Sequence, residues 1–187
     1  MIVKICGITN ARDAATAIHA GADMLGFICY PPSPRYVTPA QIAEILKAVA
    51  PLPERLRTVG VFVDASPDTI RDVMERSGLH LAQLHGGEPP AVLETLAGRA
   101  YKALRPTSLP EAEADVEWYA GLGPEAGPDL LVDAYHPAAY GGTGRRADWE
   151  IAAALAASCR LLLAGGLAPD NVAEAISRVR PWGVDVS

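Results

Sequence analysis

Eight short apolar runs recur along this chain of 187 residues at intervals of 20 to 34 residues, with helix-like stretches between them. Strands that alternate with helices pair in parallel through right-handed crossovers, and eight such units are the number that closes a barrel. The sequence therefore predicts an α/β fold, a (β/α)8 TIM barrel, in preference to an open doubly wound sheet. The predicted strands begin near Ile2, Met24, Thr58, Leu81, Tyr101, Leu130, Leu161 and Val184.

Several helix-like stretches open with residues that suit the positive end of a helix. Pro67-Asp68 and Pro169-Asp170 place a proline and a carboxylate in the first turn. We find no domain boundary, so residues 1–187 are interpreted as one barrel domain, and the Gly/Pro-rich segment 121–128 as a loop within the fifth unit. The predicted helices are Ala11–Ala20, Pro39–Ala50, Pro67–Ser77, Pro89–Leu96, Glu111–Tyr119, Asp148–Ala157 and Asp170–Arg178.

The charge balance argues against several classes of partner. A total of 16 Lys and Arg against 22 Asp and Glu leaves a net charge of −6, and no basic run is longer than Arg145-Arg146. This argues against nucleic acid and against an anionic membrane surface, and no stretch reaches the roughly 20 apolar residues of a spanning helix. We expect a small-molecule partner, and either a monomer or a homodimer.

The chain has three cysteines, Cys6, Cys29 and Cys159, at wide and irregular spacing. An odd number of this kind offers neither a disulfide framework nor a zinc motif. We therefore expect a cytoplasmic protein without a bound metal. Cys29 and Cys159 are interpreted as small core residues, whereas Cys6 ends the first strand next to a glycine.

The active site of such a barrel lies at the C-terminal ends of its strands. Each candidate there also has a structural interpretation, because Asp133 could cap a loop and His85 could be a hydrogen-bonded structural residue. A glycine pair could be a simple turn, but glycine N–H groups before a helix form a phosphate cradle, which we favour. The candidates at these ends are Cys6, Arg35, Gln83, His85, Asp133, Gly165 and Gly166.

A second glycine run, Gly141-Gly142-Thr143-Gly144, follows the sixth strand. It lacks the Lys-Ser/Thr ending of a P-loop. We interpret it as a loop over the mouth of the barrel, with Gly142 and Gly144 as candidate substrate-binding residues.

Several motifs occur in order from one end of the chain to the other, and together they resemble the phosphoribosylanthranilate isomerases of tryptophan biosynthesis. The resemblance implies an Amadori rearrangement of N-(5-phosphoribosyl)anthranilate to 1-(2-carboxyphenylamino)-1-deoxyribulose 5-phosphate, with no metal or redox cofactor. The motifs are Lys4-Ile5-Cys6-Gly7-Ile8-Thr9, Ser33-Pro34-Arg35, Gln83-Leu84-His85-Gly86, Asp133 before Gly141-Gly142-Thr143-Gly144, Leu163-Ala164-Gly165-Gly166-Leu167 and Gly183-Val184-Asp185-Val186-Ser187.

The resemblance assigns the general base to Cys6 and the general acid to Asp133. The acid must protonate the ring oxygen to open the ribose, and the base must then remove the proton from carbon 2 of the resulting iminium. Cys6 needs a nearby positive charge or dipole to act as a thiolate. Asp133 must hold a proton, which burial or a neighbouring negative charge favours.

The resemblance also implies binding roles at the same rim. Arg35 is similar to the residue that holds the anthranilate carboxylate, where a planar guanidinium can bind both oxygens. Gly165 and Gly166 match one half of the phosphate site. Gln83 and His85 are taken as further candidate substrate-binding residues.

Two other functions fit parts of the pattern. The related phosphosugar isomerase of histidine biosynthesis uses two Asp residues as acid and base, and this chain has Cys6 where that enzyme is expected to have one of them. A catalytically silent phosphate-binding barrel that serves as a partner protein is the second alternative. The presence of Cys6, Arg35 and Asp133 argues against it.

Strand parity places Lys4 inside the barrel, because residues two apart on a strand share a face and Cys6 must point inward. A buried ammonium group needs a partner. Asp185 lies on the last strand, which neighbours the first in a closed barrel. We therefore predict a Lys4–Asp185 ion pair within about 4 Å.

The sequence stops on its predicted eighth strand. A complete barrel typically has at least about 200 residues, and the resemblance implies a Ser-Gly-Val-Glu stretch and a helix after Ser187. We expect the physical protein to be longer, with its last helix absent from these 187 residues.

Overall fold

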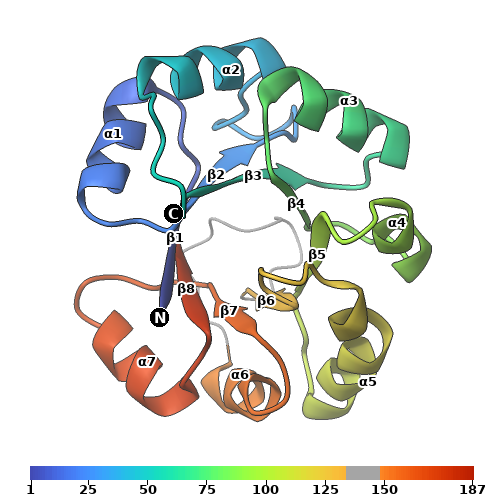
Figure 1. Cartoon of the computed structure of the whole chain (residues 1–187). Coiled ribbons are helices and arrows are strands. Elements are labelled where there is room, and N and C mark those ends of the chain that lie inside the picture. Colours follow the sequence, from blue (N-terminus) through green and yellow to red (C-terminus); the bar gives the residue numbers. More distant parts are fainter. Residues whose placement is uncertain (134–147) are drawn as a thin grey trace.

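The computed structural model describes residues 1–133 and 148–187. Eight parallel strands pair in chain order, and the last strand closes on the first to form a barrel. Figure 1 shows the strands at the centre with the helices around them. The strands are β1 (Ile2–Cys6), β2 (Met24–Ile28), β3 (Arg57–Phe62), β4 (Leu81–Leu84), β5 (Ala100–Leu104), β6 (Leu130–Val132), β7 (Leu161–Leu163) and β8 (Gly183–Val186).

The described helices lie on the outside of the barrel (Figure 1). None of them is both long enough and apolar enough to cross a lipid bilayer. They are α1 (Ala11–His19), α2 (Pro39–Ala48), α3 (Pro67–Ser77), α4 (Pro90–Thr95), α5 (Leu109–Tyr119), α6 (Trp149–Ala156) and α7 (Val172–Val179), and a 3-10 turn follows α5 at Ala120–Leu122.

Local side-chain hydrogen bonds explain where the helices begin. At α2, the Thr38 hydroxyl accepts a bond from Gln41 N, and the Gln41 side chain accepts one from Thr38 N, which is a capping box. Ser66 caps α3 in the same way through Thr69 N. These contacts satisfy backbone N–H groups that the first turn of a helix leaves without an intrahelical acceptor.

The strands alternate two sets of side chains, as the pleat requires. On β2, Leu25 and Phe27 face outward and belong to the core that the strands share with the helices. Met24 faces inward and packs with the other apolar residues of the barrel interior, so the barrel is filled rather than open. That inner cluster consists of Met24, Val59, Leu81, Tyr101, Ala103, Leu131, Leu162 and Ala164.

The predicted barrel is confirmed, and each strand begins within one residue of its predicted start. Several predicted helix boundaries differ from the structure by one or two residues. Helix α2 ends at Ala48 rather than Ala50, and α7 begins at Val172 rather than Asp170, so Pro169-Asp170 precedes the helix and does not form its first turn. Helix α5 begins at Leu109 rather than Glu111, because the Ser108 hydroxyl accepts a hydrogen bond from Glu111 N and so caps the helix earlier. The predicted loop at 121–128 also starts inside the 3-10 turn that extends α5.

Candidate active site

Cys6 ends β1 on the inner face of the barrel, two residues beyond the fully buried Lys4. Gly26 on β2 pairs with Cys6. A Cβ atom at Gly26 would lie 2.7 Å from Cys6 Sγ and 3.0 Å from Lys4 Nζ. Glycine at this position therefore leaves the space in which a thiol and an ammonium group lie side by side.

Burial raises the pKa of the Cys6 thiol above its ordinary value, and the positive charges of Lys4 and Arg35 act in the opposite direction. The net direction is upward, so the thiol is protonated at neutral pH. The cation that the sequence analysis required beside Cys6 is present. Its charge is shared with Asp185, which accepts bonds of 2.9 and 3.0 Å from Lys4 Nζ.

Arg35 approaches the same end of β1. Gly7 follows Cys6 with φ of +84°, and a Cβ atom there would collide with the Arg35 guanidinium group. Glycine is thus required at position 7 for two reasons. It adopts the left-handed backbone conformation, and it has no Cβ atom to collide with Arg35. The Arg35 backbone N donates a bond of 3.2 Å to the Ser33 hydroxyl, which orders the Ser33-Pro34-Arg35 turn.

Asp133 follows β6 directly, and its backbone N donates a 2.9 Å bond to Leu104 O of β5. It shares the inward face with Leu131, and its side chain is 11% exposed. Asp133 Oδ2 lies 3.4 Å from His85 Nε2. The structure therefore brings the candidate acid and the candidate imidazole together at the end of the barrel where Cys6 lies.

The buried side chains of Tyr101, Gln83 and His85 form a row that ends at Asp133. The Tyr101 hydroxyl donates to Gln83 Oε1 at 2.9 Å, and Gln83 Nε2 lies 2.9 Å from His85 Nδ1. Gln83 is 1% exposed and His85 is 5% exposed. Both ends of the Gln83 amide thus contact protein partners, and within the described part of the chain His85 Nε2 forms no hydrogen bond.

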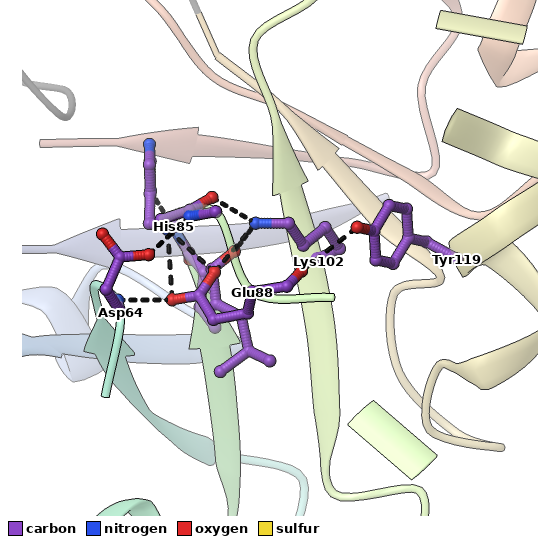
Figure 2. Close-up of polar contacts among 9 residues, drawn as sticks. Asp64, His85, Glu88, Lys102 and Tyr119 are labelled. Atoms are coloured by element: carbon purple, nitrogen blue, oxygen red, sulfur yellow. Dashed lines mark hydrogen bonds and ion pairs between the residues drawn. The ribbon is translucent and has the colours of Figure 1, made fainter. Parts of the chain in front are cut away.

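The turn after β4 is held by a buried carboxylate (Figure 2). Glu88 accepts bonds from the backbone N atoms of Asp64 and Gly86, at 2.8 and 2.9 Å, and pairs with Lys102 Nζ at 2.9 Å. Lys102 also donates to Gly86 O at 2.6 Å. Because His85 immediately precedes Gly86, these contacts fix the backbone on which the imidazole is mounted.

The pKa of Lys102 is lowered by burial, which the negative charge of Glu88 partly opposes. A second contact comes from α5, where the Tyr119 hydroxyl donates to Glu88 O at 3.1 Å. Figure 2 shows Lys102 between Glu88 and Tyr119. The cluster therefore ties the turn to β5 and to the outer helix layer.

Gly165 and Gly166 follow β7 and both have positive φ, at 85° and 65°. The side chain of Asn171 holds this turn, because its amide donates to Gly166 O and its oxygen accepts from Ala168 N, both at 2.9 Å. Helix α7 begins at the next residue, Val172. A glycine pair ahead of a helix N-terminus is the local arrangement that the phosphate hypothesis requires.

Gly142 and Gly144 lie outside the described residues, as does the whole predicted loop over the mouth. Among residues 1–133 and 148–187, no group of three or more His, Cys, Asp or Glu side chains could hold a metal ion. All three cysteines are free thiols.

The residues that hold the candidate side chains in place were not predicted from the sequence. The sequence predicts no site role for Tyr101, Glu88 or Lys102, although the lysine inside the apolar β5 segment Ala-Tyr-Lys-Ala-Leu is a signal that could have found one of them. A charge at a strand position buried on both faces needs a partner. That reasoning was applied to Lys4 and applies equally to Lys102.

Comparison with known proteins points in one direction. The family model described as N-(5'-phosphoribosyl)anthranilate (PRA) isomerase matches residues 3–187. The curated N-(5'-phosphoribosyl)anthranilate isomerase of Geobacter sulfurreducens is 46% identical over 185 residues, which are 99% of this chain and 86% of that protein. The corresponding protein of Myxococcus xanthus is 46% identical over 186 residues, 99% of this chain and 84% of its own length.

Solved structures agree with the sequence relatives. Phosphoribosyl anthranilate isomerase from Thermotoga maritima has a TM-score of 0.86 and 37% identity, covering 100% of this chain and 88% of its own. A complex of the enzyme with reduced 1-(o-carboxyphenylamino)-1-deoxyribulose 5-phosphate has a TM-score of 0.82 and 36% identity, over 100% of this chain and 87% of that one.

Proposed function

This chain belongs to the N-(5'-phosphoribosyl)anthranilate isomerase family, an aldose–ketose isomerase family of tryptophan biosynthesis, and we propose that it uses Cys6 as general base and Asp133 as general acid. One observation supports this assignment above the others. A thiol from β1 and a carboxylate after β6 both face inward at the end of the barrel where enzymes of this fold hold their substrates.

The first two proton transfers of the reaction take place at the two neighbours of carbon 1, the ring oxygen and carbon 2. Asp133 gives its proton to the ring oxygen while the bond between that oxygen and carbon 1 breaks, which leaves an iminium between carbon 1 and the anilino nitrogen. Cys6, as the thiolate formed when its own proton is lost to solvent, then removes the proton from carbon 2, and the electron pair of that C–H bond neutralises the iminium to give an enolamine. Loss of the enol proton and protonation of carbon 1 yield the ketose, so the composition is unchanged.

The order of these steps suits the thiol. Burial raises the pKa of Cys6, so a resting thiolate is disfavoured. The positive iminium that forms after the first proton transfer would lie close to Sγ and lower the thiol pKa when the base is needed. Lys4 provides a permanent positive charge beside the Cys6 thiol, in addition to that of the iminium.

The Asp133 side chain is 11% exposed and lies 3.4 Å from His85 Nε2, at the end of the barrel where Cys6 lies. We assign to Arg35 the anthranilate carboxylate, which a planar guanidinium binds through two parallel hydrogen bonds.

We assign one side of the phosphate site to Gly165 and Gly166. Their left-handed backbone and the N-terminus of α7 offer N–H groups and a positive helix end to an anion. We also place the enzyme in the cytoplasm, because a catalytic thiol must stay reduced and all three cysteines are free. The Thermotoga maritima relative is a dimeric enzyme, and a monomer or homodimer stays our prediction for this chain.

The decisive experiment is a fluorescence assay of substrate conversion with the purified protein. The wild type should consume N-(5'-phosphoribosyl)anthranilate, whereas Cys6→Ala and Asp133→Asn should each lower kcat by at least about 100-fold, the range for loss of a general acid or base. Cys159→Ala is the matched control, since that half-buried thiol donates to Leu155 O outside the barrel interior.

Circular dichroism and urea unfolding of each variant separate loss of chemistry from loss of fold. A folded Cys6→Ala or Asp133→Asn enzyme with a near-normal rate would refute the corresponding assignment. A wild-type protein that folds but leaves the substrate fluorescence unchanged would support the alternative of a silent barrel.

A further inference from the structure

The row Tyr101–Gln83–His85 continues the candidate site inward from Asp133, and every member is at least nine-tenths buried. Three distances define it. They are 2.9 Å from Tyr101 Oη to Gln83 Oε1, 2.9 Å from Gln83 Nε2 to His85 Nδ1, and 3.4 Å from His85 Nε2 to Asp133 Oδ2.

The direction of the hydrogen bonds in this row follows from the hydroxyl group. Burial raises the pKa of Tyr101, so its hydroxyl keeps its proton. In the part of the chain that the structure describes, Gln83 Oε1 is the only acceptor for that proton. The amide oxygen of Gln83 therefore faces Tyr101, and its NH2 group faces the imidazole.

An NH2 group can only donate, so His85 Nδ1 must accept. A neutral imidazole that accepts at Nδ1 carries its proton on Nε2. The reversed arrangement, with Gln83 Oε1 accepting from a protonated Nδ1, would leave the buried Tyr101 hydroxyl without an acceptor, which is costly inside a protein. The row thus selects the tautomer whose N–H is directed at Asp133.

We propose that Tyr101, Gln83 and His85 form a positioning relay that holds Oδ2 of Asp133 with the Nε2–H of a neutral His85, so that Oδ1 carries the proton delivered to the substrate. This inference rests on the proposed role of Asp133 as the acid. His85 gives up no proton in this scheme. When the proton leaves Oδ1, the new negative charge is shared over both carboxylate oxygens of Asp133, and the His85 Nε2–H stabilises it through its contact with Oδ2.

The separation of 3.4 Å is long for a hydrogen bond, and catalytic contacts are often long before the substrate binds. A His85 N–H that is otherwise unpaired in the described structure is available to shorten it. The turn held by Glu88 and Lys102 keeps the imidazole in place from the other side (Figure 2).

The test is nuclear magnetic resonance of the whole protein labelled with 15N in glutamine and histidine. The relay requires a scalar coupling across the hydrogen bond between Gln83 Nε2 and His85 Nδ1, together with the 15N shifts of a neutral Nε2–H imidazole. The reversed arrangement has an N–H···O bond at this place and shows no such coupling. A wild-type spectrum without the coupling, or with a protonated Nδ1, overturns the proposal.

Tyr101→Phe removes the group that orients Gln83. The coupling should weaken or disappear, and kcat should fall about tenfold, because the hydrogen bond from His85 to the Asp133 carboxylate, a bond to a charged group, is lost when Gln83 is no longer oriented. KM should stay within about twofold, since the contact matters in the transition state. Ser158→Ala is the control, because its hydroxyl donates to the Leu155 carbonyl outside the row and outside the Glu88 cluster, and both readouts should match the wild type.

An unchanged coupling and unchanged kcat in a folded Tyr101→Phe protein would overturn the relay. If that variant does not fold, the wild-type coupling decides alone. Asp133→Asn separates the two proposals. Full activity in that variant refutes the acid assignment. If Asp133→Asn is inactive and the wild-type protein shows no coupling, only the relay is refuted.

Discussion

Lys4 and Asp185 form a bidentate ion pair inside the barrel, with Nζ 2.9 Å from Oδ2 and 3.0 Å from Oδ1. They are register partners on β1 and β8, the two strands that close the barrel. Burial disfavours the charge of both groups, but for Lys4 the contact with Asp185 prevails and its pKa is raised. The pair predicted from strand parity is thus confirmed.

Removing one partner should cost more than removing both. Asp185→Ala leaves a fully buried ammonium group without its counter-charge, and we expect the free energy of unfolding to fall by about 3–5 kcal/mol. The double variant Lys4→Met/Asp185→Leu should recover a large part of that loss, since apolar replacements of a buried pair are often tolerated. Urea unfolding monitored by circular dichroism measures all three proteins.

The exposed pair between Arg178 and Glu174 on α7 is the control. Glu174→Gln should change the unfolding free energy by no more than about 1 kcal/mol, because solvent screens exposed pairs. A loss in Asp185→Ala as small as that in Glu174→Gln would contradict the interpretation of Lys4–Asp185 as a fully buried pair.

The raised pKa of Cys6 predicts how its reactivity depends on pH. Only the thiolate reacts with iodoacetamide, and its fraction grows about tenfold per pH unit below the thiol pKa. Since burial moves that pKa above its ordinary value of 9.0, the alkylation rate of Cys6 in the free protein should still be rising at pH 9. Peptide mass spectrometry after timed alkylation measures each cysteine separately.

The other two cysteines calibrate this measurement. Burial raises the pKa of Cys29 to about 12 and that of Cys159 to about 11, so both should react more slowly than an exposed thiol throughout this range. A rate for Cys6 that levels off near pH 7 would show a resting thiolate. In that case the iminium would not be needed to activate the base.

The Glu88 carboxylate should be sensitive to the loss of its charge alone. Glu88→Gln keeps the size of the side chain but directs an NH2 group at one of the donors now bound by the carboxylate, either Lys102 or a backbone N–H. We expect a loss of about 1–3 kcal/mol in the free energy of unfolding, the cost of a buried unsatisfied group. Thermal and urea unfolding both report this quantity.

Glu94→Gln provides a control on the exposed face of the neighbouring α4. It should leave stability within about 0.5 kcal/mol of the wild type, as surface substitutions usually do. Equal stabilities for Glu88→Gln and Glu94→Gln would mean that the carboxylate does not hold the turn after β4.

The barrel and its inner polar pair follow from the sequence because both depend on periodicity. The run Leu161-Leu162-Leu163 is continuous and apolar, as parallel strands covered on both faces require. Likewise, the two-residue parity of β1 placed Lys4 inside. Such patterns can be recognised within a short stretch of sequence, because the apolar or polar character of each residue contributes to them.

The supporting contacts of the site are not periodic. Glu88 reaches Lys102 and the backbone of Asp64 across three segments of the chain, and no spacing in the sequence links these positions. The row from Tyr101 to His85 depends in the same way on the stagger between β4 and β5. These partners are fixed by the register between strands such as β4 and β5. A single sequence does not reveal that register.

Gly26 is tightly packed against the candidate base. It faces the barrel interior beside Cys6, and an added Cβ would lie 2.7 Å from Cys6 Sγ and 3.0 Å from Lys4 Nζ. Neither neighbour can move freely, because Lys4 is held by Asp185 and the Cys6 Cα atom would itself lie 3.1 Å away. Gly26→Ala should therefore displace the thiol from the position that the reaction requires.

We expect Gly26→Ala to lower kcat by about 100-fold, since misplacement of a catalytic group by about 1 Å has this effect. Overpacking should also reduce the free energy of unfolding by about 1–3 kcal/mol. Gly121→Ala is the matched control, because a Cβ there meets no atom within 4 Å, and its kcat and stability should stay close to wild type. A folded Gly26→Ala enzyme with the wild-type rate would show that Cys6 Sγ is not held against Gly26 during the reaction.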